Sequence, residues 1–334
     1  MFRMRNKIKD TCMSFGFNRF SIKTLLLIVI ASVCIATGGM YSFADDSGET
    51  AAVQTQNDEP GKEVSKKGIQ IVDGNYPLLV DIQDIGVSYG FLNFFYNELV
   101  SSEPTGYSYT YKGQTYYYNA DKVALYDNTI SSLTNAGISI VAAVVNGYNK
   151  DFPQLRYPGV DFNDGTQYYA FNAVTEEGIN LIESCTYFLA ERYNGGDKGK
   201  VVDWVIGNEV NDNLQYNYLK PREGSSYVAE YYKQFKMFYN VIKEINPDAE
   251  VYIPLEHRWQ TANTMTDYGA RWFLEEFNRN EKKDQQMDWG VAWHPYPYPL
   301  GDPDTLDDGD EPTTDTDGSP TYGAVSYTHL RAHE

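Results

Sequence analysis

Asn208 and Glu209 directly follow a mostly apolar run, residues 201–207, that is typical of a buried β-strand. An apolar strand does not need a carboxylate at its end, and Glu is depleted in strands. In a parallel α/β barrel, the carboxyl ends of the strands form the rim that carries the catalytic residues. A Glu at such a rim, beside an Asn able to bind a hydroxyl group, suits the general acid/base of glycoside hydrolysis. The alternative is a strand that simply leaves the core at a polar turn.

A second polar pair, His294 and Tyr296, follows the apolar residues 287–293 in the same way. Side chains alternate along a strand, so His294 and Tyr296 are expected to point to the same face. Gly290 and Ala292 continue that face with small side chains, and bulky residues take the other face. Small residues inside and bulky residues outside suit a barrel strand that is backed by helices. The alternative is a proline-rich strand exit with stacked aromatic rings.

Three other polar residues are candidates for binding hydroxyl groups at the same rim. Asn93 and Asn146 come at the ends of apolar runs, although each could simply terminate its strand. His257 comes after the apolar run 250–255, with Glu256 between them. By alternation, Glu256 and His257 cannot both face the mouth of a barrel, and we favour His257.

The elements that must position these residues follow a regular rhythm. Apolar runs typical of strands alternate with amphipathic stretches typical of helices, which predicts βα units and a parallel sheet. The expected fold class is α/β, a (β/α)8 barrel. A Tyr-rich hairpin is expected as an insertion at residues 107–118. The expected strands are 90–94, 138–145, 201–206, 250–255 and 287–293, and the expected helices are 121–136, 175–193, 228–242 and 270–277.

Residues 1–44 have the composition of a secretory signal peptide. Basic residues precede a nearly uninterrupted apolar stretch at residues 24–40, and Ala44 stands where a signal peptidase would cleave. The alternative is an uncleaved membrane anchor, because the stretch approaches the roughly 20 residues of a spanning helix. Cleavage after Ala44 is favoured and predicts a secreted or extracellular protein. Residues 45–67 are acidic, polar and free of aromatic residues, which predicts a disordered linker.

The chain is acidic, with a formal net charge of −19. Such a charge opposes binding to nucleic acid or to anionic membrane surfaces, so we expect membrane contact only through an uncleaved signal. The charge fits an exported protein that acts on neutral substrates. The sequence indicates no oligomeric state.

Several other chemistries are disfavoured. Cys185 is the one cysteine beyond the expected signal peptide, and it lies on the apolar face of an expected helix, so a packing role is favoured over that of a nucleophile. The sequence lacks a Gly-x-Ser-x-Gly elbow and a Rossmann glycine fingerprint. With the last ten residues set aside, His257 and His294 are the only histidines. We therefore expect no metal and no organic cofactor.

Together, these motifs resemble those of glycoside hydrolase clan A, whose (β/α)8 barrels hydrolyse glycosides with retention. The clan's acid/base Glu follows an Asn at the end of the fourth strand, as Glu209 follows Asn208. The resemblance implies that Glu209 is the acid/base and that Asn208 binds the sugar 2-hydroxyl. Several families of the clan end the sixth strand in a His-x-Tyr pair, as at His294 and Tyr296, whose Tyr contacts the nucleophile. More narrowly, residues 81–300 resemble an uncharacterised bacterial domain family with the same landmarks.

The chain departs from the clan's pattern after Tyr296. The clan's nucleophile is a Glu at the end of the seventh strand, but residues 297–324 contain no apolar strand that ends in Glu. Retention needs two carboxylates about 5–5.5 Å apart, and the sequence indicates only one. Residues 325–334 resemble read-through of a sequencing adapter. We expect residues 68–324 to be a partial barrel that lacks strands seven and eight, and we expect this fragment to be inactive.

The expected function is therefore an exported glycoside hydrolase of polysaccharide or oligosaccharide, with activity in the intact parent protein. The alternative is a non-catalytic carbohydrate-binding barrel at the cell surface, whose full gene also lacks the nucleophile. A third hypothesis is a surface-anchored structural or adhesion protein. The sugar, its linkage, and endo or exo action depend on loops whose shape the sequence does not determine.

Overall fold

The computed structural model describes residues 65–71, 79–260 and 263–294. The expected signal peptide with its cleavage site, most of the expected linker, and Tyr296 lie outside these ranges. The expected loss of strands seven and eight and the expected adapter-like tail also concern residues outside them. Among the described helices, none combines the length and the apolar character that crossing a membrane requires.

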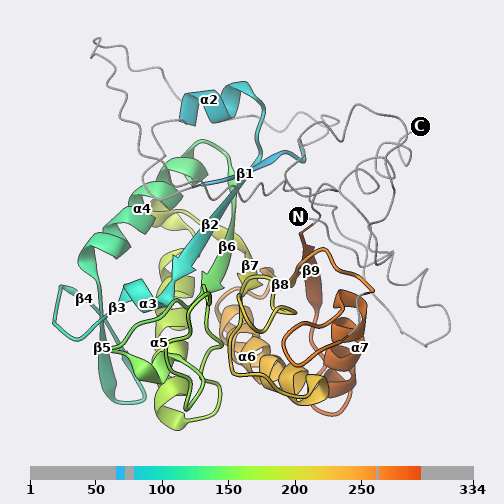
Figure 1. Cartoon of the computed structure of the whole chain (residues 1–334). Helices are drawn as coiled ribbons and strands as arrows, with labels where there is room; N and C mark the ends of the chain where they lie inside the picture. The colour runs from blue at the N-terminus through green and yellow to red at the C-terminus, as the bar shows by residue number, and fades with distance from the viewer. Residues whose placement is uncertain (1–64, 72–78, 261–262, 295–334) are drawn as a thin grey trace, which may run out of the picture.

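Six parallel strands form one sheet in the order β1-β2-β6-β7-β8-β9, so each strand pairs with its neighbours in chain order (Figure 1). Within the described residues, β1 and β9 are the two edges. This order makes β7 the fourth strand of the sheet and β9 the sixth, as the positions of Glu209 and His294 predicted. The strands are β1 (Gly68–Gln70), β2 (Tyr89–Phe95), β6 (Ser139–Val145), β7 (Val201–Ile206), β8 (Glu250–Leu255) and β9 (Trp289–Trp293).

Four long helices connect successive strands from β2 to β9, as the alternating pattern predicted. Three of them begin at a side chain that accepts hydrogen bonds from the first turn, namely Asn119, Thr175 and Glu223. Such caps satisfy backbone N–H groups that have no partner within the helix. The helices are α4 (Ala120–Asn135), α5 (Glu176–Arg192), α6 (Gly224–Ile245) and α7 (Ala270–Glu281).

The two faces of the sheet pack differently. A small apolar cluster on the inner face includes Val141, Val205, Tyr252 and Ala292, from four different strands. The opposite face, with Trp293 among others, joins the large core that the helices cover. The molecule is thus a mixed α/β protein on a curled parallel sheet, and the predicted alternation of small and bulky residues along β9 is confirmed.

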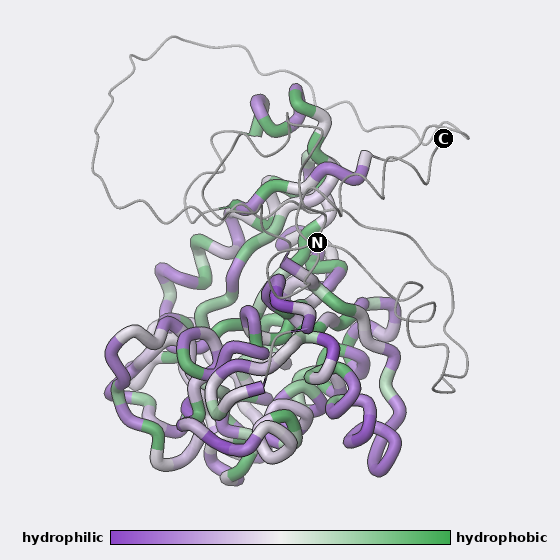
Figure 2. The backbone as a smooth tube through the Cα atoms, turned by 45° about the vertical axis from the view of Figure 1, so that its right-hand side comes forward, coloured by the Kyte–Doolittle hydropathy of each residue, from purple (hydrophilic) through white to green (hydrophobic). Residues whose placement is uncertain are grey.

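Gly290 shows why this inner face needs small side chains. A Cβ atom added at Gly290 would lie 2.6 Å from the ring of Tyr252 on the neighbouring strand. Over the molecule as a whole, hydrophobic residues run through the middle, and hydrophilic residues predominate in the loops at the bottom of Figure 2.

The predicted Tyr-rich hairpin is present and packs against α5. Strands β4 (Tyr107–Tyr111) and β5 (Gln114–Tyr118) pair antiparallel, and β3 (Val100–Ser101) adds a third strand. The hydroxyl of Tyr111 donates to Glu183 of α5 at 2.8 Å. The short elements β1, β3, α2 (Leu79–Asp84) and α3 (Tyr96–Leu99) have no expected counterpart in the sequence, because they are too short to show a period.

Candidate active site

Glu209 lies three residues past the end of β7, at the carboxyl end of the sheet. The chain leaves the strand through Gly207, whose φ is +95°, and Glu209 itself has a φ of +41°. The backbone N–H of Val210 then donates to the carbonyl of Pro254 on β8 at 3.0 Å. This tight turn buries Glu209, which is 5% exposed. The left-handed backbone costs a non-glycine residue free energy, and such strain gathers at functional sites.

The imidazole of His294 contacts the carboxyl group of Glu209. Nδ1 of His294 lies 2.8 Å from Oε1 of Glu209, and both side chains are buried. Within the described residues, Nε2 of His294 is buried and has no hydrogen-bond partner. A buried polar atom without a partner is unfavourable, so Nε2 is available to a group that enters the site.

The other predicted site residues are distributed along the rim. Asn208 is partly exposed beside Glu209. Asn93 lies inside β2, two residues before its end, on the face of Phe91 that belongs to the inner cluster. The interpretation that Asn93 ends its strand is therefore wrong, because β2 continues to Phe95. Tyr296 lies outside the described residues.

Asn146 follows β6 directly and is 1% exposed. Its amide donates to the carbonyls of Leu155 and Tyr169 at 3.2 and 3.4 Å, so it fixes the long loop to the strand end. Its Oδ1 is buried without a partner among the described residues. A structural role accounts for the amide nitrogen, and the oxygen remains available as an acceptor.

Glu256 and His257 do not behave as the alternation of side chains predicted. Nδ1 of His257 lies 3.1 Å from Oε2 of Glu256, so the two side chains approach each other. The side chain of Glu256 is 5% exposed and that of His257 is 31% exposed. The reason is that β8 ends at Leu255, and the chain beyond it no longer alternates. Glu256 is therefore the buried residue of the pair, whereas the sequence led us to favour His257.

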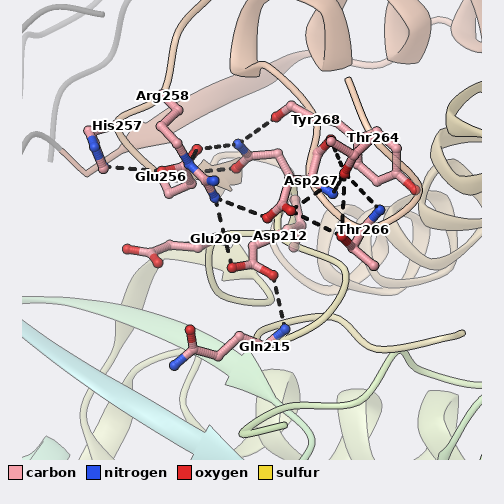
Figure 3. Close-up of polar contacts among 12 residues, drawn as sticks. Glu209, Asp212, Gln215, Glu256, His257, Arg258, Thr264, Thr266, Asp267 and Tyr268 are labelled. Atoms are coloured by element: carbon pink, nitrogen blue, oxygen red, sulfur yellow. Dashed lines mark hydrogen bonds and ion pairs between the residues drawn. The ribbon is translucent and has the colours of Figure 1, made fainter. Parts of the chain in front are cut away.

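Arg258 is the centre of a polar network that the sequence did not indicate (Figure 3). Its Nε lies 2.9 Å from Glu256, and its Nη2 lies 3.2 Å from Asp267 and 3.9 Å from Asp212. Asn211 adds a hydrogen bond from its amide to Glu256 at 2.9 Å and accepts from the backbone N–H of Glu256 at 3.0 Å. The guanidinium of Arg258, which is always charged, thus contacts the side chains of Glu256, Asp267 and Asp212.

The network joins two loops, residues 209–223 after β7 and residues 256–269 after β8. The backbone N–H of Asn213 donates to Thr266 at 2.7 Å, and that of Tyr268 donates to Asn211 at 3.0 Å. Figure 3 shows the carboxyl group of Glu209 pointing away from that of Asp212, outside the Arg258 network. The loop after β8 therefore holds the loop that carries Glu209. The carboxyl group of Glu209 points away from the contacts between the two loops.

The surroundings of Asp212 shift the pKa of its carboxyl group. Burial raises the pKa of Asp212 above its ordinary value, Asp267 adds to the increase, and the N–H of Gln215 and the charge of Arg258 only partly oppose it. Burial disfavours the charged form of a carboxyl group.

Within the described ranges, no three His, Cys, Asp or Glu side chains are grouped so that they could hold a metal ion. What the rim does offer is the buried carboxyl group of Glu209 in contact with the buried imidazole of His294. That pair can donate and accept a proton, which is the chemistry of general acid/base catalysis. Asn208 beside it can bind a hydroxyl group.

Fold and site together define a mixed α/β protein with a polar rim at the carboxyl ends of its parallel strands. The chain belongs to a family of unknown function, DUF5722, whose model matches residues 59–322. No curated protein matches the chain.

Solved structures to which the chain is similar include three glycoside hydrolases. A family 39 enzyme from Bacteroides cellulosilyticus WH2 is 16% identical with a TM-score of 0.36, over 56% of this chain and 30% of that one. The GH53 catalytic domain of Ignisphaera aggregans is 14% identical with a TM-score of 0.44, over 72% and 62%. A beta-glucosidase from Pyrococcus furiosus is 14% identical with a TM-score of 0.40, over 65% and 53%. The chain thus spans less than two thirds of the length of each structure.

Proposed function

We propose that this protein is an exported glycoside hydrolase that cleaves a polysaccharide or oligosaccharide with retention. Glu209 protonates the glycosidic oxygen as the bond breaks and then takes a proton from the attacking water. Asn208 binds the sugar hydroxyl next to the reacting carbon. His294, Tyr296, His257, Asn146 and Asn93 form the surrounding substrate site.

The observation that carries this proposal is the contact between Glu209 and His294 at the ends of the fourth and sixth strands of a parallel sheet. A general acid must be held in one orientation toward the bond that it protonates. The contact with the imidazole holds the carboxyl group of Glu209 in such an orientation.

Retention also requires a second carboxylate. Glu256 is the other buried Glu at this rim, but Arg258, Asn211 and His257 all contact its carboxyl oxygens. We therefore assign it to the network and assign no nucleophile among the described residues. We propose that a seventh strand, which is not among the described residues, supplies the nucleophile.

The source DNA beyond codon 324 gives the first test. An open frame that continues into an apolar strand ending in Glu supports the hydrolase, and a frame without it supports the carbohydrate-binding barrel. The protein encoded by the continued frame is then assayed for release of reducing ends from soluble β-glucan, xylan, mannan and galactan.

The decisive variant is Glu209→Gln, which keeps the shape of the side chain but cannot donate a proton as an acid. For polysaccharides, kcat/KM is expected to fall about 10²–10⁴-fold. The loss should be smaller for aryl glycosides with acidic leaving groups, because these need little protonation. Full activity of Glu209→Gln on polysaccharide contradicts the proposal.

The second candidate function is a carbohydrate-binding barrel without catalysis. It is favoured by the absence of an assigned nucleophile among the described residues. It predicts polysaccharide binding that survives in Glu209→Gln and no reducing-end release by any form of the protein.

A further inference from the structure

Two aromatic residues, Tyr148 and Phe162, are exposed on the same side of the molecule and touch each other. Their ring centroids lie 5.3 Å apart at an interplanar angle of 77°. Phe162 is 64% exposed and Tyr148 is 38% exposed. Apolar patches on the surface of a soluble protein mark interaction sites more often than isolated exposed residues do. We call this pair the aromatic platform.

The platform is braced rather than loosely placed. The guanidinium of Arg156 lies over the ring of Tyr148, 4.3 Å from its centroid, and the ring of Tyr169 packs at 5.6 Å. Arg156 is itself buried and donates from Nε to the carbonyl of Val160 at 3.3 Å. The exposed ring of Phe162 therefore packs on a Tyr148 ring that is itself held in place. Because Phe162 is exposed, its side chain contributes little to folding stability.

The platform and Glu209 follow neighbouring strands at the same rim. Tyr148 is the third residue past the end of β6, and Glu209 is the third residue past the end of β7. The two strands are neighbours, with Val144 paired to Ile206, and neighbouring strands lie about 4.8 Å apart.

The loop that carries Phe162 is also tied to the loop that carries Glu209. The hydroxyl of Thr166 donates to the carbonyl of Leu214 at 2.7 Å, and the N–H of Gln167 donates to Gln215 at 2.8 Å. The N–H of Asp212 in turn donates to the carbonyl of Glu209 at 2.8 Å. The platform and the candidate acid/base thus belong to one connected rim.

We propose that the aromatic platform is a carbohydrate subsite that binds a neutral pyranose unit by stacking against Phe162 and Tyr148, in a chain that extends over the rim from Glu209. This inference rests on the proposed function and adds a binding site to it. Sugar rings have apolar C–H faces that pack on aromatic rings, and carboxylates accept hydrogen bonds from their hydroxyl groups.

The charge around the platform favours a neutral sugar. Asp161 and Asp164 flank Phe162, and both are exposed. Their carboxylates can accept from hydroxyl groups, but they repel uronic acids and sulfated sugars. The net charge of −19 for the whole chain acts in the same direction.

Native affinity electrophoresis of the 334-residue chain through gels with β-glucan, xylan, mannan or galactan tests the subsite. The chain should be retarded by at least one of these neutral polysaccharides and not by polygalacturonate. Phe162→Ala should weaken that binding about 3- to 10-fold, the range expected for an aromatic contact. Ile85→Ala is the matched control, because Ile85 is 55% exposed and precedes β2 at the opposite end of the sheet.

Two results overturn the subsite. One is undiminished binding by Phe162→Ala, and the other is no retardation of the unsubstituted chain by any of the four polysaccharides. Self-association that Phe162→Ala abolishes, without sugar binding, would show that a second copy covers the platform instead.

The Asn208→Ala variant separates the subsite from the proposed function. If Phe162→Ala binds normally and Asn208→Ala does not, the subsite is wrong and the proposed site stands. If Phe162→Ala weakens binding and Asn208→Ala does not, the platform binds sugar and the proposed function loses its support.

Discussion

Nδ1 of His294 and Oε1 of Glu209 lie 2.8 Å apart, although 85 residues separate them in the chain. The contact spans β8, because β7 and β9 are its two neighbours in the sheet. Parallel strands in chain order bring their carboxyl ends to one edge, and residues from alternate strands can then meet above it.

A double-mutant cycle with Glu209→Gln and His294→Ala measures this contact. His294→Ala alone should lower the free energy of unfolding by about 1–3 kcal/mol, because it removes a hydrogen-bond partner of the buried carboxyl group of Glu209. The two changes together should deviate from additivity by at least about 0.5 kcal/mol in urea unfolding. Strict additivity would mean that the two side chains do not interact in solution.

Arg258→Met should destabilise the protein by about 2–3 kcal/mol, because it removes the cation that contacts the buried carboxylate of Glu256. The part of Arg258 that is exposed keeps the loss at the lower end of the range for buried ion pairs. Arg271→Met is the control, because Arg271 forms an exposed pair with Glu275 one turn along α7. That pair should contribute about 0.3–0.5 kcal/mol. Equal losses in the two variants would contradict the central role of Arg258.

Asp212→Asn should raise thermal stability at neutral pH and change nothing in strong acid. Burial raises the pKa of Asp212 in the folded state, so its protonated form favours folding. That contribution is fully present below the unfolded pKa and is lost as the pH rises through the folded pKa. The difference in Tm between Asp212→Asn and the unsubstituted chain should therefore grow from acid toward neutral pH.

The matched change is Asp161→Asn, which removes an exposed carboxylate from the same rim. Its difference in Tm at neutral pH should be small, because the side chain is exposed. A Tm difference for Asp212→Asn that shrinks as the pH rises would reverse the sign and contradict the prediction.

Gly207→Ala should disturb the turn that presents Glu209. A Cβ atom at Gly207 would lie 2.7 Å from Cγ1 of Val210, and the φ of +95° already disfavours a side chain. Gly86→Ala is the control, because Gly86 has a φ of +70° with nothing within 4 Å of the added atom. The left-handed backbone should cost both variants about 1–2 kcal/mol. Gly207→Ala should lower the free energy of unfolding by more than Gly86→Ala does. Polysaccharide binding, measured on both purified variants, should be lost in Gly207→Ala alone.

The long elements of the fold could be predicted from the sequence because each has a clear local signal. The strands at Val201–Ile206 and Glu250–Leu255 are mostly apolar, and the helices between strands show a helical period, with a cap in three of the four. The order of the strands followed from the alternation of strand and helix, since βα units build parallel sheets. β1 and α2 were missed because three and six residues are too few to show a period.

The candidate site could be predicted only close to the ends of strands. His294 directly follows β9, and Glu209 is the third residue past the end of β7. Their contact needed nothing beyond the order of strands. Arg258 and Asp267 lie in a loop and act on Asp212 in a different loop, so no spacing in the sequence links them. Glu256 was passed over because alternation was extended past Leu255, where the strand has already ended.

The loops after β7 and β8 share a small antiparallel bridge between Asp212 and Asp267, in addition to the Arg258 network. If one loop were replaced by that of another family member, the remaining loop would lose its hydrogen bonds to the loop that was replaced. The two loops are therefore expected to vary together, and sequence differences across the family should appear as paired changes in both.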